Sequence, residues 1–75
     1  MKRHLIGKRV EVYIVKSSSG YYGYPVKHGP VVVISSRSTP YREISGCKGV
    51  VKITDISSRA VRGELISVLE CPQNT

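Results

Sequence analysis

The sequence predicts an all-β fold, a small barrel of five short strands, from three observations. Val and Ile together number 18, whereas Leu, Ala and Met together number 5, and β-branched side chains fit a pleated, half-buried surface. Several segments alternate between apolar and polar residues, and clusters of Gly, Pro or Ser separate them. A chain of 75 residues forms one domain with a thin core, and closure into a barrel removes exposed sheet edges.

The predicted strands differ in how clearly they are marked. The first is the clearest, because Val10, Val12 and Ile14 would share one face. The second contains Pro25, which is typical of an edge or a bulge. The third is apolar on both faces, as expected of a central strand, and an irregular loop over residues 35–46 follows it. The five strands are expected near residues 9–16, 21–28, 30–36, 49–56 and 60–69.

The last strand leaves two interpretations open. Leu65, Ile66 and Leu69 also fit the period of a short helix. Gly63 and the lack of a good N-cap disfavour that helix, so we predict a strand in which Gly63 marks a bulge. Around this barrel, over residues 7–69, we expect a basic lead-in at 1–6 and a polar tail at 70–75. The predicted core comprises Val10, Val12, Ile14, Val32, Ile34, Val51, Ile53, Val61 and Leu65.

The charge balance points to a polyanionic partner. Lys and Arg number 12 against 5 for Asp and Glu, which gives a net charge of +7. The longest apolar run, residues 31–34, is far shorter than the ~20 residues of a membrane span. The basic start lacks the apolar stretch of a signal peptide, because Lys8, Arg9 and Glu11 interrupt it. We therefore expect a mature, cytoplasmic protein without a membrane partner.

The reactive side chains form no recognisable pattern in the sequence. Cys47 and Cys71 lie 24 residues apart and neither belongs to a C-x-x-C pair, which favours two unrelated reduced thiols. A disulfide would be most plausible in a hyperthermophile. Neither His4 nor His28 has zinc-ligand spacing to a cysteine, and the few acidic residues suggest no catalytic grouping. We expect no metal, no cofactor, no small-molecule substrate and no enzymatic activity.

The order of signals resembles a TRAM domain, a small RNA-binding β-barrel related to the OB-fold. An opening glycine precedes an alternating strand, a glycine-rich segment precedes a Val-rich strand, and a further glycine precedes a strand containing Ile-Thr. Two residues separate Gly20 from Gly23, where the family usually has one, and the loop before Gly46 is longer than in the family. The resemblance implies a stand-alone archaeal type of RNA chaperone. It rests on residues 7–14, 20–34, 46–56 and 60–66.

Tyrosines and cations are the candidate RNA contacts. On a strand, Tyr22 and Tyr24 would share one face and Tyr21 the other, so that exposed rings could stack on bases; alternatively, one or two of them close the barrel mouth. Tyr13 would face outward, as cover or contact. The arginines around Tyr41 could bind RNA, or their loop could be mobile and solvated. The full candidate set is Lys8, Arg9, Tyr21, Tyr22, Tyr24, Lys27, His28, Arg37, Tyr41, Arg42, Lys48, Lys52, Arg59 and Arg62.

These features favour a protein that binds RNA with little sequence specificity. It would act as an RNA chaperone or as an accessory protein on ribosomal RNA, transfer RNA or single strands, with the ribosome as a candidate partner. Two alternatives stay open. An SH3-like chromatin protein would coat duplex DNA, although it would need apolar wedges for the minor groove. A protein-interaction or assembly subunit would use its charge for solubility alone.

Overall fold

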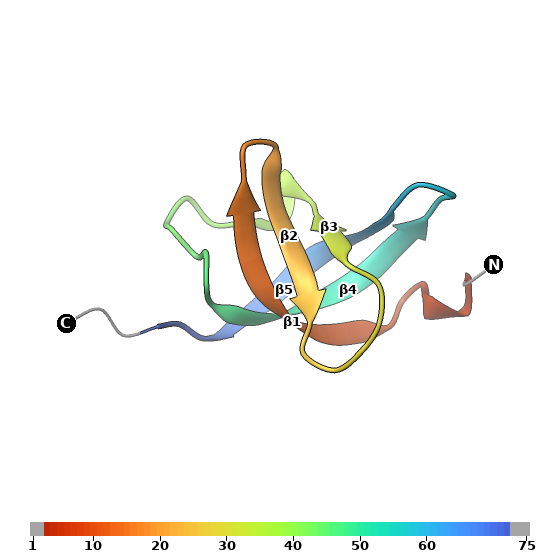
Figure 1. Cartoon of the computed structure of the whole chain (residues 1–75), viewed down its shortest axis with the longest axis horizontal. Coiled ribbons are helices and arrows are strands. Elements are labelled where there is room, and N and C mark those ends of the chain that lie inside the picture. Colours follow the sequence, from red (N-terminus) through yellow and green to blue (C-terminus); the bar gives the residue numbers. More distant parts are fainter. Residues whose placement is uncertain (1–2, 73–75) are drawn as a thin grey trace.

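Five strands form the protein in the computed structural model, which describes residues 3–72 (Figure 1). The all-β prediction is confirmed, and the helical turns in this range are two short 3-10 segments. Residues 1–2 of the expected lead-in and 73–75 of the expected tail lie outside the described residues. No helix within that part of the chain is long and apolar enough to cross a membrane. The elements are η1 (Arg3–Leu5), β1 (Arg9–Ser17), β2 (Gly20–Pro25), β3 (Val32–Ile34), η2 (Ser36–Ser38), β4 (Lys48–Ile56) and β5 (Val61–Glu70).

The strands close in the order β1-β2-β3-β5-β4. Strand β1 pairs antiparallel with β2 and β4, β2 pairs antiparallel with β3, and β4 pairs antiparallel with β5. A parallel pairing of β3 with β5 completes the circle. The first four strands therefore have the spatial order 4-1-2-3 of a Greek key, and the whole is a five-stranded barrel of the OB kind. In Figure 1, β1 and β2 cross in front of the long β4–β5 hairpin.

Two predicted strands are shorter in the structure. Strand β2 ends at Pro25, which has no N–H to donate to a neighbouring strand. Strand β3 begins after Pro30 and stops before the η2 turn at Ser36. Strand β5 extends to Glu70, so that the expected tail begins one residue later than predicted.

The core consists almost entirely of the inward faces of the strands. Seven of the nine predicted core residues are buried, while Val10 and Leu65 are half-buried against the others. Ile44 and Cys47, from the loop before β4, are also buried and were not predicted. A single apolar residue in an irregular loop has no period by which it could be recognised. The buried core is Val12, Ile14, Val32, Ile34, Ile44, Cys47, Val51, Ile53 and Val61.

Bulges explain the ambiguous pattern of β5. The register moves from Val51↔Leu65 to Val50↔Ser67, which leaves Ile66 without a partner, and a second shift leaves Leu69 unpaired. Both side chains are about half exposed. The extra residues break the alternation and imitate a helical period. A bulge was predicted on β5 at Gly63. The irregularity at this point is on the paired strand β4, where the register shifts between Ile53 and Asp55.

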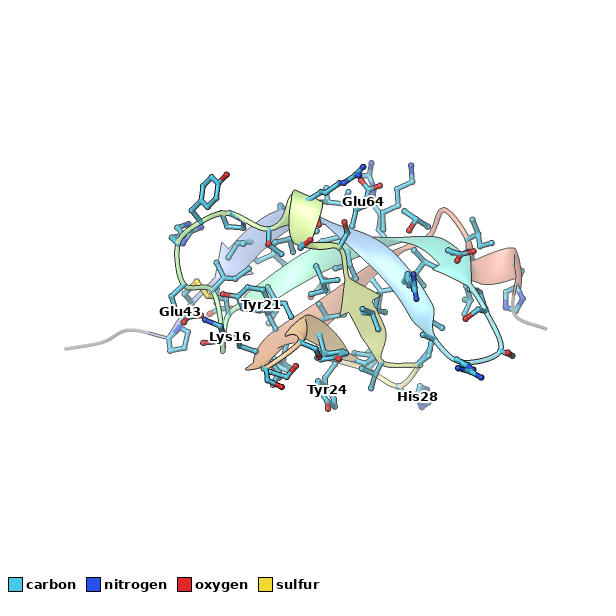
Figure 2. All side chains as sticks on the ribbon, turned by 90° about the horizontal axis from the view of Figure 1, so that it is seen from above. Lys16, Tyr21, Tyr24, His28, Glu43 and Glu64 are labelled. Atoms are coloured by element: carbon cyan, nitrogen blue, oxygen red, sulfur yellow. A yellow bond between two sulfur atoms is a disulfide. The ribbon has the colours of Figure 1, made fainter. Side chains whose placement is uncertain are left out.

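Glu43 fastens the β3–β4 loop to the end of the barrel (Figure 2). Its Oε1 accepts hydrogen bonds from the Tyr21 hydroxyl at 2.9 Å and from the Ser45 N–H at 3.1 Å. Its Oε2 lies 3.5 Å from Lys16 Nζ. The hydrogen bond from the Ser45 backbone, followed by that from Tyr21, lowers the pKa of Glu43 to about 2.

A disulfide joins Cys47 to Cys71, so the interpretation as two reduced, unrelated thiols is wrong. The two cysteines flank the cross-strand pair Lys48↔Glu70, and the β4–β5 hairpin brings their Cα atoms to 4.0 Å. Sequence spacing gave no sign of this, because the contact depends on how the hairpin returns to its start.

We expect loss of the disulfide to destabilise the fold by about 3 kcal/mol, because it closes a loop with a sequence separation of 24 residues. Urea denaturation of the wild type and of Cys71→Ser, each with and without dithiothreitol, measures this. The reductant should lower the wild-type midpoint and leave that of Cys71→Ser unchanged. An unchanged wild-type midpoint after a thiol assay has shown full reduction would contradict the expectation.

Glu43→Gln should remove one source of acid sensitivity. The folded-state pKa of Glu43 is about 2, below its ordinary value of 4.5. Its stabilisation is therefore fully present above pH 4.5 and is lost as the pH falls toward 2. Thermal midpoints of wild type and variant should differ most near neutral pH and converge in acid. Glu11→Gln, which removes an exposed carboxylate with no side-chain hydrogen bond or ion pair to residues 4–72, is the control and should not show this convergence.

Candidate nucleic-acid interface

An aromatic platform occupies the outer face of the β1–β2 hairpin. Tyr13 lies opposite Tyr24, and Val15 lies opposite Tyr22, so these four side chains form a contiguous patch that we call the aromatic platform. Tyr13 is 47 % exposed and Tyr24 is 49 % exposed. Alternation along β2 places Tyr22 and Tyr24 on this face, as the sequence predicted.

Tyr22 is held in place at the edge of the platform. Its hydroxyl lies 2.7 Å from Ser19 Oγ, in the turn between β1 and β2. Hydrogen bonding to Ser19, with a smaller contribution from Ser17, lowers the pKa of Tyr22. The turn therefore fixes the orientation of one ring, which reduces the conformational entropy lost when a base stacks on it.

Tyr21 closes the end of the barrel, which is the alternative role that the sequence left open for one or two of the clustered tyrosines. Its ring packs against the core and its hydroxyl donates to Glu43. The Nζ atom of Lys16 lies 6.0 Å from the ring centroid. Tyr21 thus anchors the loop before β4 and does not belong to the platform, whereas Tyr13 does. Alternation along β1 correctly predicted that Tyr13 faces outward, but it left the role of this side chain open.

The structure brings two of the predicted cations beside the platform. Lys48 pairs with Tyr13 across the β1–β4 ladder, and its Nζ lies 5.9 Å from the Tyr13 ring centroid. The same Nζ lies 3.7 Å from Glu70 Oε2. On the opposite flank, Tyr22 pairs with Val33, and Val33 pairs with Arg62. Cations therefore lie on the strands to both sides of the tyrosines.

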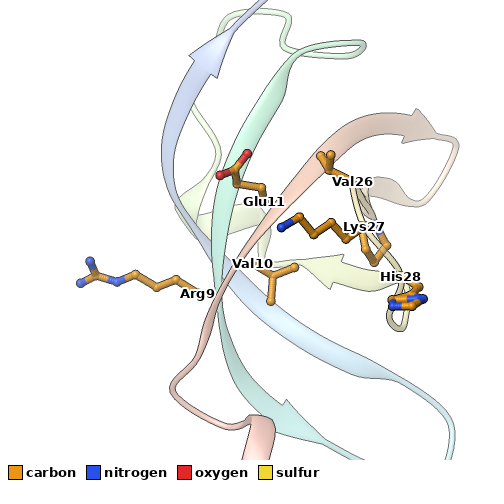
Figure 3. A pocket seen from close by; sticks show the side chains of 7 residues that line it. Arg9, Val10, Glu11, Val26, Lys27 and His28 are labelled. Atoms are coloured by element: carbon orange, nitrogen blue, oxygen red, sulfur yellow. The ribbon is translucent and has the colours of Figure 1, made fainter.

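Lys27 and His28 line a separate recess of about 310 Å³ beside β1 (Figure 3). Val10 and Val26 contribute its apolar part. The Arg9 side chain points away from Lys27 and His28. Figure 2 shows Tyr24 and His28 along one side of the barrel and Glu64 on the opposite side.

The remaining candidates lie on other elements. Arg9 faces Lys52 across the β1–β4 ladder, and Lys8 immediately precedes β1. Tyr41 is fully exposed in the loop that also carries Arg42, and Arg37 belongs to η2. Arg59 lies in the turn between β4 and β5. Within residues 4–72, no hydrogen bond, ion pair or cation–ring contact links these side chains to the platform, so their role in binding remains a prediction from the sequence.

Comparison with known proteins gives one relative. An uncharacterized protein of the archaeon Methanopyrus kandleri (strain AV19) is 35 % identical over 75 residues, which covers 93 % of this chain and 14 % of the relative. The chain thus spans about a seventh of the length of the protein it matches. No family model matches the chain. No solved structure matches it either.

Proposed function

We propose that the protein binds single-stranded RNA with little sequence preference. The observation that carries the proposal is the group of three tyrosines, Tyr13, Tyr22 and Tyr24, on one outer face of a barrel with a net charge of +7. The core lies on the inner faces of the same strands, so the platform is not needed to fill the barrel. Flat exposed rings offer stacking surfaces to unpaired bases, and every base has such a face.

The flanking cations supply the second half of the mechanism. Lys48 and Arg62 lie on either side of the tyrosines, where they can contact the phosphates of a strand whose bases stack on the platform. Contact of each phosphate with a cation releases counterions, which favours binding at low salt. Neither contact reads a base edge, and this accounts for low sequence specificity.

The resemblance to a TRAM domain supports the same assignment, and RNA chaperone activity or an accessory role on ribosomal or transfer RNA would follow from it. A platform of flat rings suits unpaired bases better than it suits the minor groove of duplex DNA, where apolar wedges are used. A cytoplasmic location is part of this proposal.

Loss of one platform ring should weaken RNA binding without changing its salt dependence. Stacking is worth about 1–3 kcal/mol per base, so Tyr24→Ala should raise the Kd for oligo-uridine roughly 5- to 150-fold. Tyr24→Phe keeps the ring and is the matched control, with affinity close to wild type. Fluorescence anisotropy titrations at several salt concentrations give both the Kd and the salt slope.

Loss of the loop cations Arg37 and Arg42, unlike loss of a platform ring, should change the salt dependence of RNA binding. Arg37→Gln combined with Arg42→Gln should reduce the slope of log Kd against log salt by about 0.7 for each phosphate contact removed. The same titrations measure it. The proposal fails in favour of a chromatin or assembly role if these variants and Tyr24→Ala all leave RNA affinity unchanged, or if duplex DNA outcompetes RNA at every salt concentration.

A further inference from the structure

A polar groove of about 680 Å³ begins where the aromatic platform ends. The cross-strand row Tyr22–Val33–Arg62 leads from the platform into it, and both Val33 and Arg62 line the groove. Ser19, which hydrogen-bonds the Tyr22 hydroxyl, lines it as well. Tyr22 and Arg62 are two strand spacings apart, or about 10 Å. Successive nucleotides of an extended strand can bridge that distance.

The charges in this groove are unusual for so basic a protein. Two of its five acidic residues, Asp55 and Glu64, line the groove together with Arg62. Asp55 lies opposite Arg62 in the β4–β5 ladder, and Glu64, two residues after Arg62 on β5, lies opposite Lys52. Among residues 4–72, no cation lies within 4.0 Å of either carboxylate, whereas Glu43 and Glu70 each have a lysine partner.

Two hydroxyl groups of the groove already donate their hydrogen within the protein. Thr39 donates its hydroxyl hydrogen to the Ser36 carbonyl at 2.9 Å, and Thr54 donates to the Arg62 carbonyl at 3.4 Å. Ionised carboxylates only accept hydrogen bonds. A ligand that satisfies the two carboxylates must therefore bring hydrogen-bond donors. Phosphate oxygens bring none, but the ribose 2′-hydroxyl of RNA does, and DNA lacks it.

We propose that the groove binds the ribose of an RNA strand that stacks on the aromatic platform. Asp55 or Glu64 accepts a hydrogen bond from a 2′-hydroxyl, while Arg62 contacts the adjoining phosphate. This inference rests on the proposed function and makes it more specific, because stacking alone does not distinguish RNA from DNA. The two carboxylates repel the phosphates of either nucleic acid, and only RNA offers the hydrogen bond that compensates for this repulsion.

The test compares oligo-uridine with oligo-deoxyuridine of equal length, two probes that differ only in the 2′-hydroxyl. Anisotropy titrations at one fixed salt concentration should show that the wild type prefers the ribose form by about tenfold, as expected for a hydrogen bond to a charged group. Asp55→Ala combined with Glu64→Ala should bring this ratio close to one. Both residues are exposed, and thermal midpoints check that the variant is folded.

Glu11→Ala is the matched control, because it removes an exposed carboxylate that does not line the groove. It should strengthen binding of both probes by a similar factor and preserve the ratio. If the double variant also strengthens both and preserves the ratio, the carboxylates only repel phosphate and the inference is wrong. Equal binding of both probes by the wild type overturns the inference and leaves the RNA-binding proposal standing, whereas failure to bind either probe overturns both.

Discussion

The three-residue parallel pairing between β3 and β5 closes the barrel, and the rest of the structure depends on it. Val32 lies opposite Val61 and Ile34 lies opposite Gly63, and the Ser35 N–H donates to the Gly63 carbonyl at 2.8 Å. A side chain at Gly63 would meet the Lys52 carbonyl oxygen at 2.8 Å and Val32 at 3.0 Å, so only glycine permits this approach. Closure also makes one continuous outer surface from β2 across β3 to β5, which is why the aromatic platform and the polar groove adjoin.

The small interior decides where the tyrosines go. The largest fully buried side chains are isoleucines, and the chain has neither Phe nor Trp. A barrel of five short strands is filled by aliphatic side chains, and a phenol ring with its hydroxyl fits only at an end or outside. Tyr21 takes the end, while Tyr13, Tyr22 and Tyr24 lie outside. Exposed aromatic surface in this protein thus follows from the same size limit that makes the core thin.

The strands and most of the core could be predicted from the sequence, because they depend on the order of neighbouring residues. The alternation at Val10, Val12 and Ile14 predicted β1 and its inward face, and similar patterns predicted the other strands and most of the core. Contacts between residues distant in the sequence could not be predicted in this way. The pairing of Cys47 with Cys71 and the anchoring of the loop by Glu43 depend on how distant segments meet in the fold. The outward direction of the platform was predictable from alternation, but its neighbours were not, because they follow from strand order. The RNA-binding role and the TRAM resemblance stay predictions.

The acidic residues divide into two groups with different consequences for binding. Glu70 pairs with Lys48 beside the platform, where the Lys48 side chain is 27 % exposed and that of Glu70 is 72 % exposed. Ion pairs at a protein surface are worth about 0–1 kcal/mol, which is less than one stacked base contributes. A phosphate could therefore replace Glu70 as the partner of Lys48 at little cost in free energy, so the ion pair would not prevent a strand from binding to the platform. Asp55 and Glu64 form no ion pair within 4.0 Å among residues 4–72. In the proposed complex they would therefore act directly on a bound strand, and the choice between ribose and deoxyribose would depend on them rather than on the platform.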